Sequence, residues 1–276
     1  MHTFMTGLAI GESPRWHDGR LWLSDMGAGE VVAVDAAGRR EAVVPVPAMP
    51  MGTGWLPDGR MLIVSARDGR LLCRAPDGTL STHADLTGLA TFPWSDMVVD
   101  GRGNAYVSNI GFDFPAGDFA PGTVALVRDG AARQVADGLA FPNGLAVTPD
   151  GGTLIVAESY AHRLTAFDVA GDGSLANRRV WADLGETAVP DGICLDAENA
   201  VWYADVPNRR CVRVREGGAV AQTVELDRGC FACALGGPDR RTLFLTVAQW
   251  PEAMTPGSRT GEVRTVRVDV PGAGWP

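Results

Sequence analysis

Residues 15–25 read RWHDGRLWLSD, two short runs of β-forming side chains joined by an Asp-Gly pair. Asp-Gly between such runs is typical of a tight β-hairpin, because glycine tolerates the positive φ that these turns require. The pattern returns five more times, at residues 54–66, 97–109, 145–159, 193–205 and 233–247. Six copies of one hairpin unit therefore account for most of the chain.

The acidic residue in each hairpin turn marks the repeat. Successive turn acids are 40, 42, 50, 46 and 43 residues apart, counted over Asp18, Asp58, Asp100, Asp150, Asp196 and Asp239. A period in the forties with about four strands per unit is typical of β-propeller blades. A third strand follows each hairpin, as in residues 30–38, and a fourth precedes the next unit, as in residues 40–47. We therefore predict an all-β fold, a six-bladed β-propeller with four-stranded blades, formed by residues 1–276 as a single domain.

The outermost strand of the last blade has no segment in its own unit. Residues 2–8, HTFMTGL, are predicted to supply it, because a ring closed by an N-terminal strand leaves no exposed sheet edge. Helical periodicity is nearly absent, which disfavours an α/β fold.

Composition restricts the partners. The net charge of −9 argues against nucleic acid and against anionic membranes, since both require an excess of basic residues. No secretory signal and no membrane-spanning run of apolar residues is recognisable. The five cysteines are an odd number in a chain of this size, so we expect their side chains to be reduced thiols. We expect a cytoplasmic protein with a small-molecule substrate and leave its oligomeric state open.

Cys230 and Cys233 form a CxxC pair, which is compatible with redox chemistry or half of a zinc site. No second CxxC, no nearby histidine and no βαβ context accompany the pair, so a packing role is favoured.

The repeat indicates where chemistry is located. In a propeller blade the first strand lines the central channel, so residues five to seven positions before each turn acid are predicted to ring one channel mouth. Counting back gives Glu12, the Gly52/Thr53 region, Ser95, Asn143, Asp191 and Cys233. Glu12, Asn143 and Asp191 are oxygen donors, and carboxylates gathered in a channel require a cation between them. Taken singly, Glu12 could cap a turn, while Asn143 and Asp191 could be ordinary turn residues.

We therefore predict one divalent metal held by Glu12, Asn143 and Asp191. Carboxylate and amide oxygens without imidazole or thiolate favour a hard cation, of which Ca²⁺ fits best, with Mg²⁺ and Mn²⁺ as alternatives. Zn²⁺ is compatible with a site that keeps open positions.

The segments GESPRWHDGRLWLSDM, FPNGLAVTPDGGTLIVAES, VPDGICLDAENAVWYAD and GGPDRRTLFLTV resemble the senescence marker protein/gluconolactonase family, also called the regucalcin family. The resemblance spans nearly the whole chain. It implies a six-bladed propeller that hydrolyses lactones, often of sugars, with one divalent metal bound by a Glu, the Asn of PNG and the Asp of PDG. These positions match Glu12, Asn143 and Asp191.

The third unit departs from the family pattern. Many members carry an Asn-Asp pair preceded by an Arg that contacts substrate, whereas this chain has Pro93, Ser95 and Asp96 at these positions. Losing the Arg removes a donor suited to a polyhydroxylated substrate. Trp94 suggests a more apolar ligand or, equally, core packing. Ser95, Asp96, Trp94 and Asn109 are our candidate substrate-binding residues.

Metal-assisted hydrolysis is the predicted mechanism, with Asp191 as the catalytic general base and Asp96 in reserve. None of the four histidines has the sequence context of a Ser/His/Asp triad. Polar residues that end the second strands are expected to terminate them through hydrogen bonds, namely Asp25, Ser65, Glu158 and Asp205.

Asn109 differs from these because a long insertion, IGFDFPAGDFAPG, follows it. On the metal side such an insertion is predicted to be a lid or specificity loop, with Phe112, Phe114 and Phe119 as walls, and residues 249–261 could act similarly. Two further functions stay open beside lactone hydrolysis. One is another metal-assisted step, such as isomerisation or ring opening, and the other is a noncatalytic calcium-binding propeller.

Overall fold

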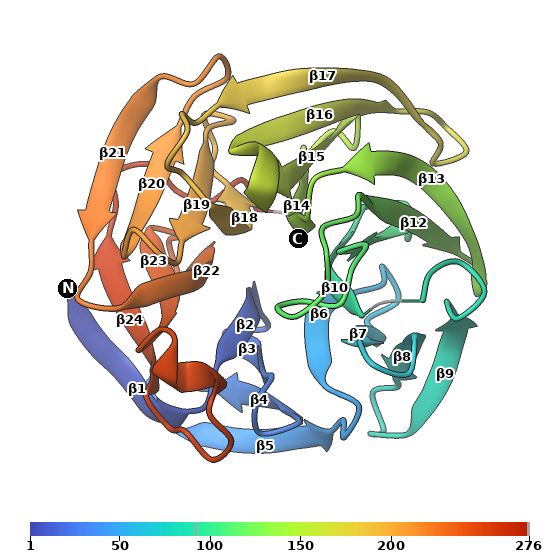
Figure 1. The fold of residues 1–276 in the computed structure, drawn as a ribbon. Helices are drawn as coiled ribbons and strands as arrows, with labels where there is room; N and C mark the ends of the chain where they lie inside the picture. The colour runs from blue at the N-terminus through green and yellow to red at the C-terminus, as the bar shows by residue number, and fades with distance from the viewer. Residues whose placement is uncertain (92, 275–276) are drawn as a thin grey trace.

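The computed structural model describes residues 1–91 and 93–274, with position 42 described by its backbone alone. Six four-stranded antiparallel sheets stand around a central channel as the blades of a propeller (Figure 1). The predicted fold, including the four-stranded blades, is confirmed. The innermost strands are β2 (Gly11–His17), β6 (Pro50–Trp55), β10 (Trp94–Val99), β14 (Pro142–Val147), β18 (Pro190–Leu195) and β22 (Gly229–Gly236).

Each chain segment then runs outward through its blade. The second strands are β3 (Arg20–Asp25), β7 (Met61–Ser65), β11 (Ala105–Asn109), β15 (Thr153–Glu158), β19 (Val201–Asp205) and β23 (Thr242–Ala248). The third strands are β4 (Glu30–Val34), β8 (Arg70–Arg74), β12 (Gly122–Arg128), β16 (Arg163–Val169), β20 (Arg210–Val214) and β24 (Gly261–Arg267). The outermost strands are β5 (Arg40–Pro45), β9 (Leu80–Asp85), β13 (Ala131–Leu139), β17 (Leu175–Asp183), β21 (Val220–Glu225) and β1 (His2–Leu8).

The hydrophobic core consists of wedges between neighbouring blades. Six apolar clusters each join two adjacent blades, so that all six blade junctions around the ring are filled. Second strands such as β7, β11 and β19 are buried along their whole length, because both faces of each blade pack against a neighbour. This explains why these strands are nearly continuous apolar runs rather than alternating ones.

The hairpin turns use their acids in two ways. In the first blade Asp18 and Gly19 both have positive φ, at 49° and 73°, in a two-residue turn. In the other five blades the turn carboxylate accepts the backbone N–H two residues further on, at 2.8–3.1 Å, which stabilises a longer turn. The positive φ predicted for the glycine of an Asp-Gly turn is found at Gly19, Gly59 and Gly151, whereas the two-residue turn is found in the first blade.

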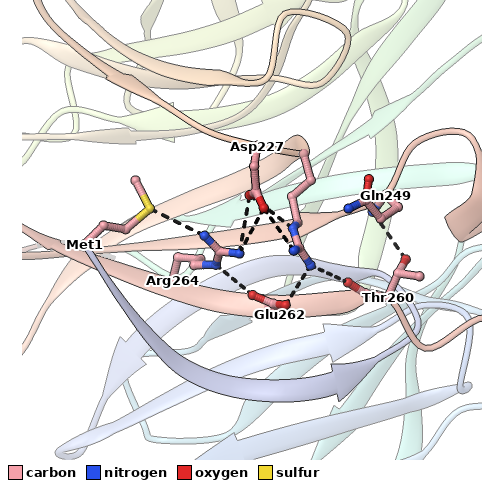
Figure 2. Close-up of polar contacts among 7 residues, drawn as sticks. Met1, Asp227, Gln249, Thr260, Glu262 and Arg264 are labelled. Atoms are coloured by element: carbon pink, nitrogen blue, oxygen red, sulfur yellow. Dashed lines mark hydrogen bonds and ion pairs between the residues drawn. The ribbon is translucent and has the colours of Figure 1, made fainter.

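The N-terminal strand closes the ring, as predicted. β1 pairs antiparallel with β24, from His2 opposite Thr265 to Leu8 opposite Gly261, and completes the blade formed by β22, β23 and β24. A charge network lies beside this junction (Figure 2). Arg228 and Arg264 each form ion pairs with both Asp227 and Glu262. These pairs connect the segment before β22 with β24.

Two short 3₁₀ turns complete the structure, η1 (Ser159–Ala161) and η2 (Glu252–Met254). Within residues 1–91 and 93–274, no helix is both long and apolar enough to cross a membrane.

Candidate functional site

A β-bulge near the start of each innermost strand creates the site. All six strands β2, β6, β10, β14, β18 and β22 show a register shift against their second strand within their first residues. Glu12, Ser95, Asn143 and Asp191 each follow directly after the residue that pairs with the end of the second strand. The four residues therefore occupy equivalent positions in four blades, as the repeat predicts.

In the other two blades the predicted positions were wrong. The pairing places Met51, not Gly52 or Thr53, at the equivalent position in the second blade. In the sixth blade it places Cys230, because Cys233 pairs with Leu245 beyond the bulge. Met51 lies seven residues before Asp58, as Asn143 does before Asp150, whereas Cys230 lies nine residues before Asp239, because β22 has eight residues while β6 and β14 have six.

Glu12 owes its position to a strained neighbour. Ser13 has a φ of 47°, a left-handed conformation that a non-glycine residue adopts only when surrounding contacts enforce it. Its Oγ accepts the N–H of Thr53 at 2.9 Å, and its carbonyl accepts the Thr53 hydroxyl at 3.0 Å. The second blade thus holds the bulge that presents Glu12.

Asn143 and Asp191 lie in strands β14 and β18, so the alternative reading of both as turn residues is wrong. The Asn143 amide is close enough to the Asp191 carboxylate to oppose the rise in the pKa of that carboxyl. Asn143 Nδ2 also lies 3.4 Å from Ser159 Oγ, which in turn donates to the carbonyl of Pro190 at 2.7 Å. Ser108 Oγ donates to the Asn143 carbonyl at 3.0 Å. These bonds fix both the backbone and the side chain of Asn143.

The glycines of the PNG and PDG segments serve close packing rather than turns. A Cβ at Gly144 would lie 2.5 Å from the carbonyl oxygen of Asp191 and 2.7 Å from the nitrogen of Ile193. A Cβ at Gly192 would lie 2.4 Å from the Cβ of Ala232. Neither glycine has a positive φ. Only a residue without a side chain lets neighbouring innermost strands approach this closely at the channel.

Asp96 is paired with a buried arginine. Arg15 Nη2 lies 3.4 Å from Asp96 Oδ1 and donates to the Met97 carbonyl at 2.8 Å, while the Met97 N–H donates to the same carboxylate oxygen at 2.8 Å. Arg15 Nη1 donates to the Pro14 carbonyl at 2.9 Å. Asp96 is therefore neutralised by the protein itself, unlike Glu12 and Asp191.

The site carboxylates disfavour one another's ionisation. Burial, reinforced by the carboxylates of Asp191 and Asp96, raises the pKa of Glu12 well above its ordinary value. Burial and the nearby Asp96 carboxylate likewise raise the pKa of Asp191, against the hydrogen bond from Asn143. The half-buried carboxylate of Glu12, the buried carboxylate of Asp191 and the amide oxygen of Asn143 fit a hard divalent cation.

The remaining candidate residues occupy different environments. Ser95 is buried at its equivalent position beside Asp96. Trp94 is 1% exposed and packs in the apolar cluster between the second and third blades, which favours the packing interpretation. Asn109 is buried; its Nδ2 donates to the Pro93 carbonyl at 3.1 Å and its Oδ1 accepts the Gly111 N–H at 3.0 Å.

Three acids at the ends of second strands have structural roles, as expected. Asp25, Glu158 and Asp205 are fully buried. Each accepts a backbone N–H from the segment that leads into its own blade, and each is paired with at least one arginine. These contacts fix the blade entries and supply the carboxylates with counter-charges.

A thiol cluster between the fifth and sixth blades was not foreseen. Cys194, Cys211, Cys230 and Cys233 pack together, and the sulfurs of Cys194 and Cys233 are 3.7 Å apart. Burial raises the pKa of Cys211 and Cys230. Across the described residues, no three side chains of His, Cys, Asp or Glu are arranged to hold a metal ion. The channel donors include an amide, which lies outside those four types.

The two predicted loops differ in position. Residues 110–121 extend from β11 toward the centre of the ring, whereas the loop that carries η2 lies nearer the rim (Figure 1). The first loop is therefore the one placed to contact a ligand at the channel mouth. A hollow of about 470 Å³ lined by Thr148, Asp150 and Trp181 lies at the opposite end of the blades, beside the hairpin turns.

Fold and channel mouth together define a six-bladed propeller with converging carboxylate and carboxamide groups on its axis. The chain belongs to the SMP-30/Gluconolactonase/LRE-like family, whose sequence profile matches residues 10–249. It is 26% identical to the 6-deoxy-6-sulfogluconolactonase of Pseudomonas putida, over 97% of this chain and 94% of that enzyme. It is 27% identical to the regucalcin of Xenopus laevis, over 87% and 83% of the two chains.

A solved structure shares the fold. The calcium-binding protein regucalcin of Agrobacterium tumefaciens superimposes with a TM-score of 0.84 at 23% identity, covering 98% of this chain and 94% of that one.

Proposed function

We propose that this protein is a divalent-metal-dependent hydrolase of a lactone or related cyclic ester. The observation that carries the proposal is the charge balance in the channel. Three carboxylates, from Glu12, Asp96 and Asp191, gather in the channel, and within residues 1–91 and 93–274 only that of Asp96 has an ion pair, with Arg15. Two negative charges are left without a partner, and one divalent cation neutralises them.

The donor set selects the type of metal. Glu12, Asn143 and Asp191 would hold the cation through oxygen atoms, which favours Ca²⁺, with Mg²⁺, Mn²⁺ and Zn²⁺ as alternatives. The calcium-binding description of the Agrobacterium regucalcin supports the same choice. When bound, the cation polarises a substrate carbonyl and lowers the pKa of a water molecule.

The chain's own residues supply orientation and proton transfer. Asp191 is the proposed general base, and the neighbouring Asn143 amide favours its ionised form. Asp96 is the reserve base, but its Oδ1 already accepts from Met97 and Arg15. Ser95 is proposed to contact substrate from the equivalent position of the third blade. Trp94 and Asn109 are proposed to act on substrate indirectly, by holding the surrounding backbone.

Family membership and the enzyme names of relatives favour hydrolysis over the other functions. The name of the Pseudomonas relative designates a lactonase. The regucalcin names favour a calcium-binding propeller as the second candidate. Isomerisation or ring opening on the same site would require the same metal but give a different product.

Metal removal and lactone assays distinguish metal-dependent hydrolysis from a noncatalytic calcium-binding propeller. Bound metal is measured by elemental analysis, and hydrolysis of aliphatic, aromatic and sugar lactones is then assayed with each cation before and after chelation. We expect chelation to abolish hydrolysis and Asp191→Ala to abolish both metal binding and turnover, while Asp168→Ala, at an exposed ion pair, leaves both unchanged. Hydrolysis that persists after complete metal removal would contradict the proposal. Tight calcium binding without turnover of any lactone would favour the noncatalytic propeller.

A further inference from the structure

Five aromatic rings form one cluster beside the channel mouth. We call Phe112, Phe114, Phe119, Phe141 and Tyr160 the aromatic wall. Phe112 is 3% exposed and is its centre, with ring centroids 5.5–6.2 Å from those of the other four residues. Three of the rings belong to the loop 110–121, and two flank the start and end of the β14–β15 hairpin.

The aromatic wall is joined to the candidate metal ligands through short connections. Phe141 is two residues before Asn143 in the chain. Tyr160 directly follows Ser159, whose Oγ lies 3.4 Å from Asn143 Nδ2 and donates to the carbonyl of Pro190. A molecule whose reacting group lies at Asn143 therefore has the wall as its neighbour on the fourth blade.

The loop that carries three of the rings is closed at its base. The Asn109 side chain bonds both the Pro93 carbonyl and the Gly111 N–H. Gly111 has a φ of 91°, and a Cβ there would lie 2.4 Å from the Pro121 carbonyl oxygen, so the two ends of the loop are in close contact. A preformed wall binds a ligand with little further loss of conformational entropy.

Two rings of the wall remain open to solvent. Phe119 is 53% and Tyr160 is 43% exposed, and their centroids are 5.9 Å apart. The loop 110–121 contains Asp113 and Asp118 but no basic residue. Exposed flat rings favour a flat apolar group, and neighbouring carboxylates disfavour an anionic one.

We propose that the aromatic wall binds the aryl substituent of an uncharged lactone, with Phe119 as a specificity-determining residue. This inference rests on the proposed lactone hydrolysis, because it names the substrate class of the same site. A polyhydroxylated or anionic sugar lactone would find no basic side chain in this loop and, on the exposed ring of Phe119, no polar group.

Substrate selectivity tests the inference. The ratio of kcat/KM for γ-phenyl-γ-butyrolactone to that for γ-butyrolactone is measured in the wild type and in Phe119→Ala. We expect this ratio to fall by about fivefold in Phe119→Ala, because a change of that size corresponds to the usual free energy of one aromatic contact. The matched control is Met254→Ala, which removes a similarly exposed apolar side chain from the loop nearer the rim and leaves the ratio unchanged.

A second variant distinguishes an aryl group from an alkyl group. Phe119→Leu keeps an apolar side chain but removes the flat ring. For each substituted lactone, kcat/KM is divided by that for γ-butyrolactone. We expect Phe119→Leu to lower this ratio for the phenyl lactone and to leave it near the wild-type value for γ-cyclohexyl-γ-butyrolactone. Equal retention of both ratios in Phe119→Leu would overturn the aryl assignment.

Binding of a lactam separates this inference from the proposed function. Calorimetry with γ-phenyl-γ-butyrolactam, which resists hydrolysis, reports the subsite without turnover. Lactam binding that Phe119→Ala weakens, in a protein that hydrolyses no lactone, would support the subsite and contradict the hydrolase. Lactone hydrolysis with the same selectivity in wild type, Phe119→Ala and Met254→Ala would overturn the subsite and leave the hydrolase standing. Absence of lactam binding would likewise overturn the subsite.

Discussion

The guanidinium of Arg15 and the carboxylate of Asp96 join the first and third blades inside the channel, with Nη2 and Oδ1 3.4 Å apart. Both side chains are about one-tenth exposed, so the pair is shielded from solvent. Arg15 also donates to two backbone carbonyls, which fixes its position. The pair neutralises Asp96 and leaves the charges of Glu12 and Asp191 for a cation.

Breaking this pair is expected to destabilise the metal-free protein. Arg15→Met should lower the free energy of unfolding by about 3 kcal/mol, because it leaves a buried carboxylate without a counter-charge. Urea denaturation in the presence of a chelator measures the change. Arg179→Met breaks an exposed pair with Asp168 and should change the free energy of unfolding far less, because solvent screens that pair. An equal decrease in the free energy of unfolding in the two variants would show that the channel pair contributes no more to stability than an exposed ion pair.

Removing one site carboxylate should stabilise the metal-free protein and weaken metal binding. In Glu12→Gln the repulsion from Asp191 and Asp96 disappears, so the free energy of unfolding without metal should rise by about 1–3 kcal/mol. The apparent affinity for Ca²⁺ should fall at the same time. Unfolding curves with and without the cation measure both effects. A Glu12→Gln protein that is less stable than wild type without metal would refute the repulsion.

Metal affinity should depend on pH with a defined sign. The raised pKa values of Glu12 and Asp191 mean that both hold protons above the usual carboxylate range in the metal-free protein. A cation must displace these protons, so its apparent affinity should rise with pH and fall as pH drops through the raised pKa values. Calorimetry in buffers of different ionisation enthalpy counts the released protons. Binding without proton release at any pH above the ordinary carboxylate range would rule out the raised pKa values.

The close approach at Gly144 predicts a severe effect of one methyl group. In Gly144→Ala the new Cβ would meet backbone atoms of Asp191 and Ile193 at 2.5 and 2.7 Å, so strand β18 has to move. We expect a loss of stability of about 2–3 kcal/mol and weaker metal binding. Gly171→Ala is the matched control, since a Cβ there has no neighbour within 4 Å and no positive φ to oppose it. It should be neutral or stabilising by about 0.5 kcal/mol.

Sequence repetition was sufficient for the fold. The six hairpins and the outer strands of the first five blades followed from local patterns, because β-hairpins are formed by neighbours in the chain. The closure by residues 2–8, which pair with β24 at the other end of the chain, followed from the missing outer strand of the last blade. The positions in the second and sixth blades did not follow. Met51 and Cys230 replaced the expected residues because the distance from the bulge to the turn acid varies between blades, and no local signal reports the place of the bulge.

Side-chain contacts between blades could not be predicted from the sequence either. Trp94 looked like a candidate substrate contact beside Ser95 and Asp96, but it packs into the junction of the second and third blades. The four clustered thiols come from three strands of two blades, and only one of their pairs, Cys230 and Cys233, is close in sequence.

The sequence by itself determined the number of blades, the strand order and the closing strand, together with Glu12, Asn143 and Asp191 as equivalent oxygen donors. Only the tertiary structure decided which charges meet in the channel. In the sequence, nothing marked Arg15 as the partner of Asp96. The sequence also pointed to only three rings of the aromatic wall, the phenylalanines of the insertion. Both arise from contacts between blades, and such contacts depend on how six twisted sheets pack rather than on the residues beside each position in the chain.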